Sequence, residues 1–194
     1  MSTDGKKAKT VVLKICLLGD GAVGKTSLRT RYLGEGFTTQ YSETIGADFA
    51  LKFAKLDDLL IKHQIWDIAG QPRYTQVRSI LFDRSDGGLL LFDLSNRNSL
   101  TSVENWIKTY VQYAGVGAVI LIGNKSDLRD EDGVTGLVTR EEAEKMAKDL
   151  SEKYDRPIPY LETSAKSGEN VDKAFDILAR TYFDLSDKSL GGKD

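Results

Sequence analysis

The most constraining feature of this sequence is a glycine-rich segment, residues 19–26, which reads GDGAVGKT. It follows an apolar run, residues 11–18, and precedes a helix-forming segment, residues 27–33. A strand before and a helix after are the context in which the pattern GxxxxGK(S/T) binds phosphate. Glycines let backbone N–H groups converge on phosphate oxygens, and the helix N-terminus adds partial positive charge. The segment therefore predicts a strand–loop–helix unit of an α/β fold, with a phosphate-binding loop.

Two side chains of this loop have expected chemical roles. Lys25 would reach the β- and γ-phosphates as a point charge, and the Thr26 hydroxyl would ligate Mg²⁺. A glycine-rich turn that happens to precede Lys-Thr is the alternative, and the strand, the helix and the full spacing together disfavour it. The other residues expected to cradle the phosphates are Gly21, Ala22, Val23, Gly24 and Ser27.

The rest of the chain alternates apolar runs of strand length with segments of helical periodicity, which indicates one α/β domain. Two of the runs meet at Asp57-Asp58 as an expected hairpin, and the other strands should run parallel. Thr139 and Glu142 form a capping box that begins a helix, and apolar stripes predict further helices within residues 100–114 and 171–182. The expected strands are residues 11–18, 48–56, 59–66, 87–94, 118–123 and 158–161.

Composition restricts the class of protein. The 194 residues are 40% hydrophobic, which suits a single globular domain, expected over residues 10–185 between flexible tails at 1–9 and 186–194. Twenty-seven Lys and Arg against 29 Asp and Glu leave a net charge of -2, so nucleic acid is not an expected partner. The single cysteine, Cys16, is expected to be a buried thiol, and no stretch reaches the roughly 20 apolar residues of a membrane span. We expect a cytoplasmic protein.

The nucleotide base must be identified elsewhere, because the loop alone suits ATPases, nucleoside kinases and GTPases equally. Asn124, Lys125 and Asp127 follow the expected strand at 118–123, at the strand end where open α/β sheets bind ligands. The Asp127 carboxylate can accept hydrogen bonds from N1–H and the 2-amino group of guanine. Adenine has neither donor there and would leave the carboxylate unpaired, at a cost of roughly 1.5 to 3 kcal/mol. These residues therefore favour guanine.

A second base-side segment, residues 162–166 (ETSAK), follows the last expected strand. The Ala165 backbone N–H could meet the guanine carbonyl oxygen, and Ser164 and Lys166 lie beside it in sequence. The segment is a weak indication of function alone. Together with residues 124–127 it is a strong indication of a guanine site.

Five motifs in order resemble those of the Ras-superfamily small GTPases, and the sequence is most similar to the Rab group. The resemblance implies an α/β fold, the P-loop NTPase fold of a small GTPase, with a six-stranded, mostly parallel sheet and helices on both faces. It also implies a switch that cycles between GTP and GDP, binds them with Mg²⁺ and slowly hydrolyses GTP, in membrane traffic or signalling. The motifs are residues 19–26, Thr44 within 44–49 (TIGADF), 67–71 (DIAGQ), 124–127 (NKSD) and 164–166 (SAK).

The resemblance also assigns roles to loop residues that have no clear pattern of their own. Phe37 would stack edge-on against the base, and Lys125 would pack along the base and support the phosphate loop. Tyr41 and Thr44 would belong to a first mobile loop, in which the Thr44 hydroxyl binds Mg²⁺ and its N–H binds the γ-phosphate. Loss of the γ-phosphate would then release this loop.

A second expected mobile segment starts at Asp67, which would hold the metal through water. The Gly70 N–H would touch the γ-phosphate, and Gln71 would orient the attacking water. No arginine of this chain is implied as an internal finger, so unaided hydrolysis should be slow; a finger from a partner is worth about 10³ to 10⁵ in rate. The expected catalytic residues are Gln71, Lys25 and Thr44, and the expected metal ligands are Thr26, Thr44 and Asp67.

The expected partners are guanine nucleotide and the effectors, exchange factor and GTPase-activating protein of a small GTPase, and the chain is expected to be a monomer. A hydrolysis-deficient GTP-binding scaffold is one alternative, which the presence of Gln71, Thr44 and Asp67 disfavours. A phosphotransferase acting on a small molecule is a second alternative. It ranks lower because the sequence has no arginine-rich lid segment.

Three parts of the sequence depart from the Rab pattern: Pro72, the C-terminus and the polar stretch at residues 128–138. Pro72 follows Gln71 where an acidic residue is usual, and proline fixes φ and lacks an N–H, which predicts a stiffer second switch. The Gln-Pro-Arg sequence is similar to some Arf-like members, but Ser2 replaces the glycine that a myristoylation signal needs. The C-terminal residues include no cysteine for prenyl groups, so membrane association is open: either the chain is truncated or it does not use that anchor.

Several other polar residues are expected to lie outside the chemistry. His63, the only histidine, alternates within the third strand and is expected to be packed. Arg73, Arg78 and Arg84 are expected to face partners or solvent. Residues 128–138 are polar, charged and contain two glycines, which predicts a solvated loop.

Overall fold

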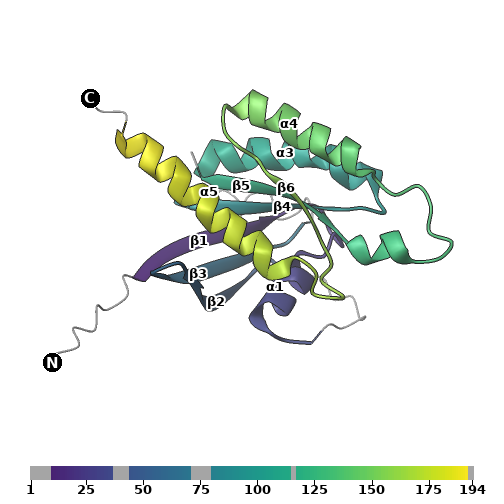
Figure 1. The fold of residues 1–194 in the computed structure, drawn as a ribbon, viewed down its shortest axis with the longest axis horizontal. Helices are drawn as coiled ribbons and strands as arrows, with labels where there is room; N and C mark the ends of the chain where they lie inside the picture. The colour runs from purple at the N-terminus through teal and green to yellow at the C-terminus, as the bar shows by residue number, and fades with distance from the viewer. Residues whose placement is uncertain (1–9, 37–43, 71–79, 115–116, 192–194) are drawn as a thin grey trace.

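The structure is a computed structural model that describes residues 10–36, 44–70, 80–114 and 117–191, with side chains as far as residue 187. The described residues form a six-stranded sheet in the order β2-β3-β1-β4-β5-β6 (Figure 1). The β2–β3 pair is antiparallel, and every other pair of this sheet is parallel. The strands are β1 (Thr10–Leu18), β2 (Ala47–Leu56), β3 (Leu59–Ile68), β4 (Gly87–Asp93), β5 (Ala118–Asn124) and β6 (Tyr160–Thr163).

Helices cover both faces of this sheet (Figure 1). One face carries α1 (Lys25–Leu33) and α5 (Val171–Gly191), and the other carries α3 (Arg97–Ala114) and α4 (Arg140–Tyr154). A short 3-10 helix, η2 (Ser126–Asp130), follows β5.

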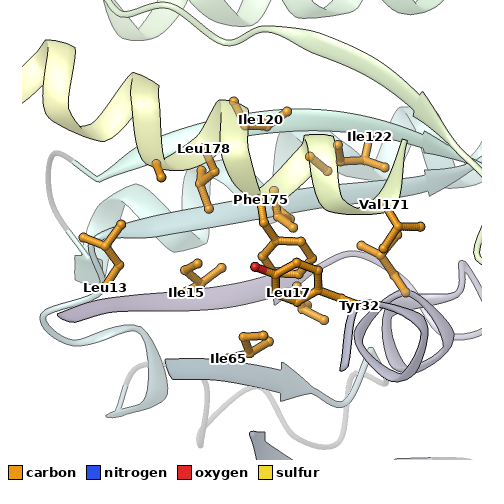
Figure 2. Close-up of a cluster of buried hydrophobic side chains, with 14 of the residues drawn as sticks. Leu13, Ile15, Leu17, Tyr32, Ile65, Ile120, Ile122, Val171, Phe175 and Leu178 are labelled. Carbon is orange, nitrogen blue, oxygen red and sulfur yellow. The ribbon is translucent and has the colours of Figure 1, made fainter. Parts of the chain in front are cut away.

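Two buried clusters fix these layers. Because successive strand residues point to opposite faces, Ile15 faces α5 whereas Cys16 faces α3. Figure 2 shows the cluster on the face of the sheet that carries α1 and α5. In it, Tyr32 of α1 stacks on Phe175 of α5, with their ring centroids 3.6 Å apart. Cys16 is fully buried and His63 is 2% exposed, as expected for packed side chains.

The parallel strands place the site. β1, β3, β4, β5 and β6 all run in one direction, so their carboxyl ends meet at one edge of the sheet, where open α/β folds bind ligands. The segments that leave this edge are residues 19–24, 69–70, 125–127 and 164–166. They include most of the residues that the sequence singled out.

Two elements that were predicted from short sequence patterns, the hairpin and the capping box, are confirmed. The β2–β3 hairpin turns at Asp57, which adopts a left-handed conformation with φ 51. The capping box is also present: the Thr139 hydroxyl accepts from the Glu142 N–H at 3.2 Å, and the Glu142 carboxylate accepts from the Thr139 N–H at 2.8 Å.

Three segments differ from their expected form. β6 begins at Tyr160, not at 158, because Pro159 has no N–H to donate and the Ile158 N–H bonds the Ser151 hydroxyl instead. α5 continues to Gly191, past the boundary at 185, and Leu185 still packs against the core. Residues 128–138 begin within η2 and end at Val138, which is fully buried, so this segment is solvated only in its middle.

None of the described helices combines the length and the hydrophobicity needed to cross a membrane.

Candidate functional site

The glycine-rich segment forms the connection between β1 and α1. Gly19 has φ 134, and a Cβ there would lie 2.3 Å from the Leu91 carbonyl oxygen. Gly24 has φ 98, and a Cβ there would lie 2.2 Å from the Asn124 amide nitrogen. L-residues rarely adopt these conformations, and no side chain fits the space. The two glycines therefore allow the loop to pack tightly against β4 and β5.

Lys25 folds back over this loop. Its side chain is buried, and Nζ donates to the carbonyl oxygens of Gly19 and Asp20, each at 2.7 Å. The same ammonium lies 5.9 Å from the centroid of the Trp106 ring. A buried ammonium group needs oxygen partners, and phosphate oxygens can take the place of these carbonyls. The arrangement holds one positive charge at the mouth of the loop.

Three oxygen-bearing side chains meet beside Lys25. The Thr26 hydroxyl donates to Asp67 Oδ2 at 2.5 Å and lies 2.9 Å from the Thr44 hydroxyl. Asp67 is fully buried, and its Oδ1 has no hydrogen-bond partner in the described part of the chain. Burial raises the pKa of the Asp67 carboxyl, opposed by the Thr26 hydrogen bond and by the charges of Lys25 and Arg29. These hard oxygen atoms, one of them lacking a partner, fit a divalent cation such as Mg²⁺.

Gly70 brings the chain after β3 against the phosphate loop. A Cβ at Gly70 would lie 2.4 Å from the Asp20 carbonyl carbon and from the Gly21 nitrogen. Only a glycine permits so close a backbone approach. Three residues expected to act in this region, Phe37, Tyr41 and Gln71, lie outside the described residues, as do Pro72, Arg73 and Arg78. Arg84 is described and exposed.

Asn124 links the phosphate loop to the end of β6 and the turn that follows it. It is 1% exposed, and Nδ2 donates to the Val23 carbonyl oxygen at 2.9 Å. Its Oδ1 accepts from the Thr163 hydroxyl at 3.1 Å and from the Ala165 N–H at a longer 3.4 Å. Lys125, which was expected to pack along a base, adopts φ 71 and forms an ion pair with Asp93 at 2.6 Å.

Asp127 lies at the start of η2, held from the turn after β6. Oδ1 accepts from the Ser164 hydroxyl at 2.5 Å, and Oδ2 lies 3.6 Å from the Lys166 ammonium. The two base-side segments therefore meet, although 37 residues separate Asp127 from Ser164. A carboxylate with this support can accept two parallel hydrogen bonds from a planar ligand.

Three contacts at the site involve residues that the sequence did not single out. The Trp106 indole N–H donates to Asp20 Oδ1 at 2.7 Å, which ties the phosphate loop to α3. The Arg31 guanidinium bonds backbone carbonyls of the turn after β6. Arg129 of η2 and Glu162 of β6 form a two-pronged ion pair with bonds of 2.6 and 2.9 Å. Glu162 belongs to the expected base-side segment 162–166, whereas the only signal for Arg129 is that it lies two residues after Asp127.

Comparison with known proteins identifies the family. A model of the Ras family matches residues 14–184. The GTP-binding protein yptV5 of Volvox carteri is 39% identical over 177 residues, covering 89% of this chain and 82% of the relative. Human Ras-related protein Rab-8B is 37% identical over 175 residues, covering 90% and 80%. Mouse Ras-related protein Rab-9A is 37% identical over 186 residues, covering 93% and 88%.

The matched region contains every described segment at the carboxyl edge of the sheet, from the phosphate loop to the turn after β6. The matched family, the fold of the sheet, and the phosphate-side and base-side segments all indicate the same class of protein. The chain therefore belongs to the Ras family, as a Rab-like small GTPase that binds guanine nucleotide and hydrolyses GTP.

Proposed function

We propose that this chain is a GTP/GDP switch of the Rab type whose nucleotide and Mg²⁺ share one site at the carboxyl edge of the sheet. The observation that carries the proposal is the meeting of three side chains at the Thr26 hydroxyl, which lies 2.5 Å from Asp67 Oδ2 and 2.9 Å from the Thr44 hydroxyl. Thr26 and Thr44 would hold Mg²⁺ directly and Asp67 through water. Bound there, the ion would neutralise charge on the β- and γ-phosphate oxygens.

Guanine selectivity is proposed to come from the base-side segments. Asp127 would accept from N1–H and the 2-amino group, and the Ala165 N–H would donate to the base carbonyl. Support comes from the hydrogen bond between Ser164 and Asp127, which orients the carboxylate, and from the long Ala165 bond, which a ligand oxygen could replace at little cost.

Hydrolysis is proposed to use Lys25 and Gln71. The Lys25 ammonium would stabilise the negative charge that develops on the transferred phosphoryl group, and Gln71 would orient the attacking water. The close approach of Gly70 to the phosphate loop supports this, because Gly70 directly precedes Gln71 in the sequence. Turnover without a partner would be slow, because no arginine of this chain is assigned to the phosphates.

Switching is proposed to depend on two segments that contact the γ-phosphate, one through Thr44 and one through Gly70. Both adjoin the phosphate loop, and losing the γ-phosphate would remove the contact that holds them there. Effectors, an exchange factor and a GTPase-activating protein would recognise the two states. We further propose a cytoplasmic monomer, with or without contact to a membrane surface, acting in membrane traffic or signalling.

Phosphate release by wild-type protein and by Gln71→Leu tests this function. Wild-type protein should release phosphate slowly over several turnovers, and Gln71→Leu should abolish release while GTP binding survives. Arg180→Ala, which removes a surface ion pair to Asp57, is the control and should behave as wild type. Unchanged single-turnover hydrolysis in Gln71→Leu would refute the role of that residue. Absence of turnover in wild-type protein would instead favour a hydrolysis-deficient scaffold.

A further inference from the structure

The Arg31 side chain connects the helix that starts at the phosphate loop to the turn that follows β6. Its Nε donates to the Ala165 carbonyl oxygen at 2.9 Å, and a terminal guanidinium nitrogen donates to the Lys166 carbonyl oxygen. A guanidinium presents its donors in a fixed planar fork, so bonds to two successive carbonyls restrain both position and orientation of the turn. A single lysine ammonium could not reproduce this restraint.

The turn that Arg31 holds carries the Ala165 N–H, one of the two groups proposed to read the base, and the Ser164 hydroxyl, which bonds the other group, the Asp127 carboxylate. Ser164 donates to Asp127 Oδ1 at 2.5 Å, so displacement of the turn also moves this carboxylate or removes its partner. The Ala165 N–H lies on the residue whose carbonyl Arg31 binds, and it makes only a 3.4 Å bond to Asn124. The position of the turn therefore sets the geometry of two hydrogen-bonding groups at once.

α1 gives Arg31 a fixed place relative to the phosphates. Lys25 opens the helix, and Arg31 lies six residues later, about 9 Å along the axis at 1.5 Å per residue. Leu28 and Tyr32 of the same helix are buried in the core, so the helix cannot shift freely. The phosphate end and the base end of the site are thus joined by one buried helix and one side chain.

We propose that Arg31 is a positioning residue for guanine recognition, which sets the turn after β6 at the distance from the phosphate loop that a guanine nucleotide requires. It touches neither base nor phosphate, and it acts through Ala165 and Ser164. This inference rests on the proposed assignment of Asp127 and Ala165 to the base.

The test compares GDP with inosine diphosphate, which lacks the 2-amino group but keeps the same sugar and phosphates. Dissociation constants and dissociation rates for both nucleotides are measured on wild-type, Arg31→Ala and Arg31→Lys proteins. Arg31→Ala should release GDP roughly tenfold faster, the scale of one lost charge-assisted hydrogen bond, and the preference for GDP over inosine diphosphate should shrink. Arg31→Lys should restore part of that preference.

Arg180→Ala is the matched control, because it removes a surface arginine with an ion pair to the hairpin residue Asp57. It should leave the rates and the preference as in wild type. Equal weakening of both nucleotides in Arg31→Ala, with the preference kept, would show that Arg31 does not position Asp127 through Ser164 and would overturn that step of the proposal; unchanged binding of both nucleotides would overturn the proposal whole. A wild-type protein without preference for GDP would overturn the proposed base contacts themselves, so the two failures are distinguishable.

Discussion

The buried His63 imidazole predicts a loss of stability in mild acid. His63 is 2% exposed, and its Nδ1 lies 2.8 Å from the Tyr32 hydroxyl, within the core between β3, α1 and α5. Burial, together with the positive charge of Lys52, lowers the pKa of His63 from 6.5 to about 4, while Asp176 opposes this shift. The folded protein therefore resists a proton that the unfolded chain accepts.

The magnitude follows from proton linkage. The unfolded chain binds a proton at His63 as the pH falls through 6.5, whereas the folded chain binds it only near a pKa of about 4. The contribution of His63 to stability is therefore fully present above pH 6.5 and is lost as the pH falls toward 4. Since one pKa unit corresponds to about 1.4 kcal/mol, His63 alone should lower the free energy of unfolding by about 2 kcal/mol between pH 8 and pH 5.

Urea denaturation followed by circular dichroism measures this loss. Wild-type protein and His63→Gln are unfolded between pH 8 and pH 5 at fixed GDP and Mg²⁺ concentrations, so that the ligand contribution is the same for both. The glutamine amide can still form a hydrogen bond with the Tyr32 hydroxyl but does not titrate. The wild-type curve should fall about 2 kcal/mol further than the variant curve. Parallel pH profiles would refute the assignment of the acid sensitivity to His63.

Three further predictions follow from the site and the core. Asp127→Asn replaces an acceptor pair by an amide donor, so the preference for guanine over xanthine nucleotides should fall by roughly two orders of magnitude, measured by competition binding; an unchanged preference would contradict the base contact. Gly70→Ala forces a Cβ against the Asp20 and Gly21 backbone, so thermal unfolding should show a loss of about 1 to 3 kcal/mol and GTP affinity should drop more than GDP affinity. Burial raises the pKa of the Cys16 thiol to about 11, so a thiol reagent should react only after urea unfolding, and rapid reaction of native protein would argue against its burial.

The elements of this fold could be predicted because their signals are local. The capping box at Thr139 is complete within four residues, and the apolar run of β1 is read directly from the chain. The end of α5 could not be predicted in this way, since residues 186–191 have the composition of a tail. Tyr182, Phe183 and Leu185 keep the helix on the core, and this packing depends on strands far away in sequence.

The phosphate and base motifs were recognisable for the same reason, because each one is a short run with a fixed spacing. The contacts that support them are not local. Arg31 lies 134 residues from Ala165, and Trp106 lies 86 residues from Asp20. Nothing in the residue type distinguishes Arg31 from its neighbour Arg29, which pairs with Asp48 instead. Only the folded chain shows which arginine serves the site.

The guanine nucleotide site at the carboxyl edge of the sheet is tested most directly by the nucleotide that remains bound through purification. The purified protein is denatured, and the released nucleotide is separated by ion-exchange chromatography and quantified against protein. We expect close to one molecule of GDP or GTP per chain. Release of ADP or ATP in similar amounts would contradict the assignment of this site to guanine nucleotides.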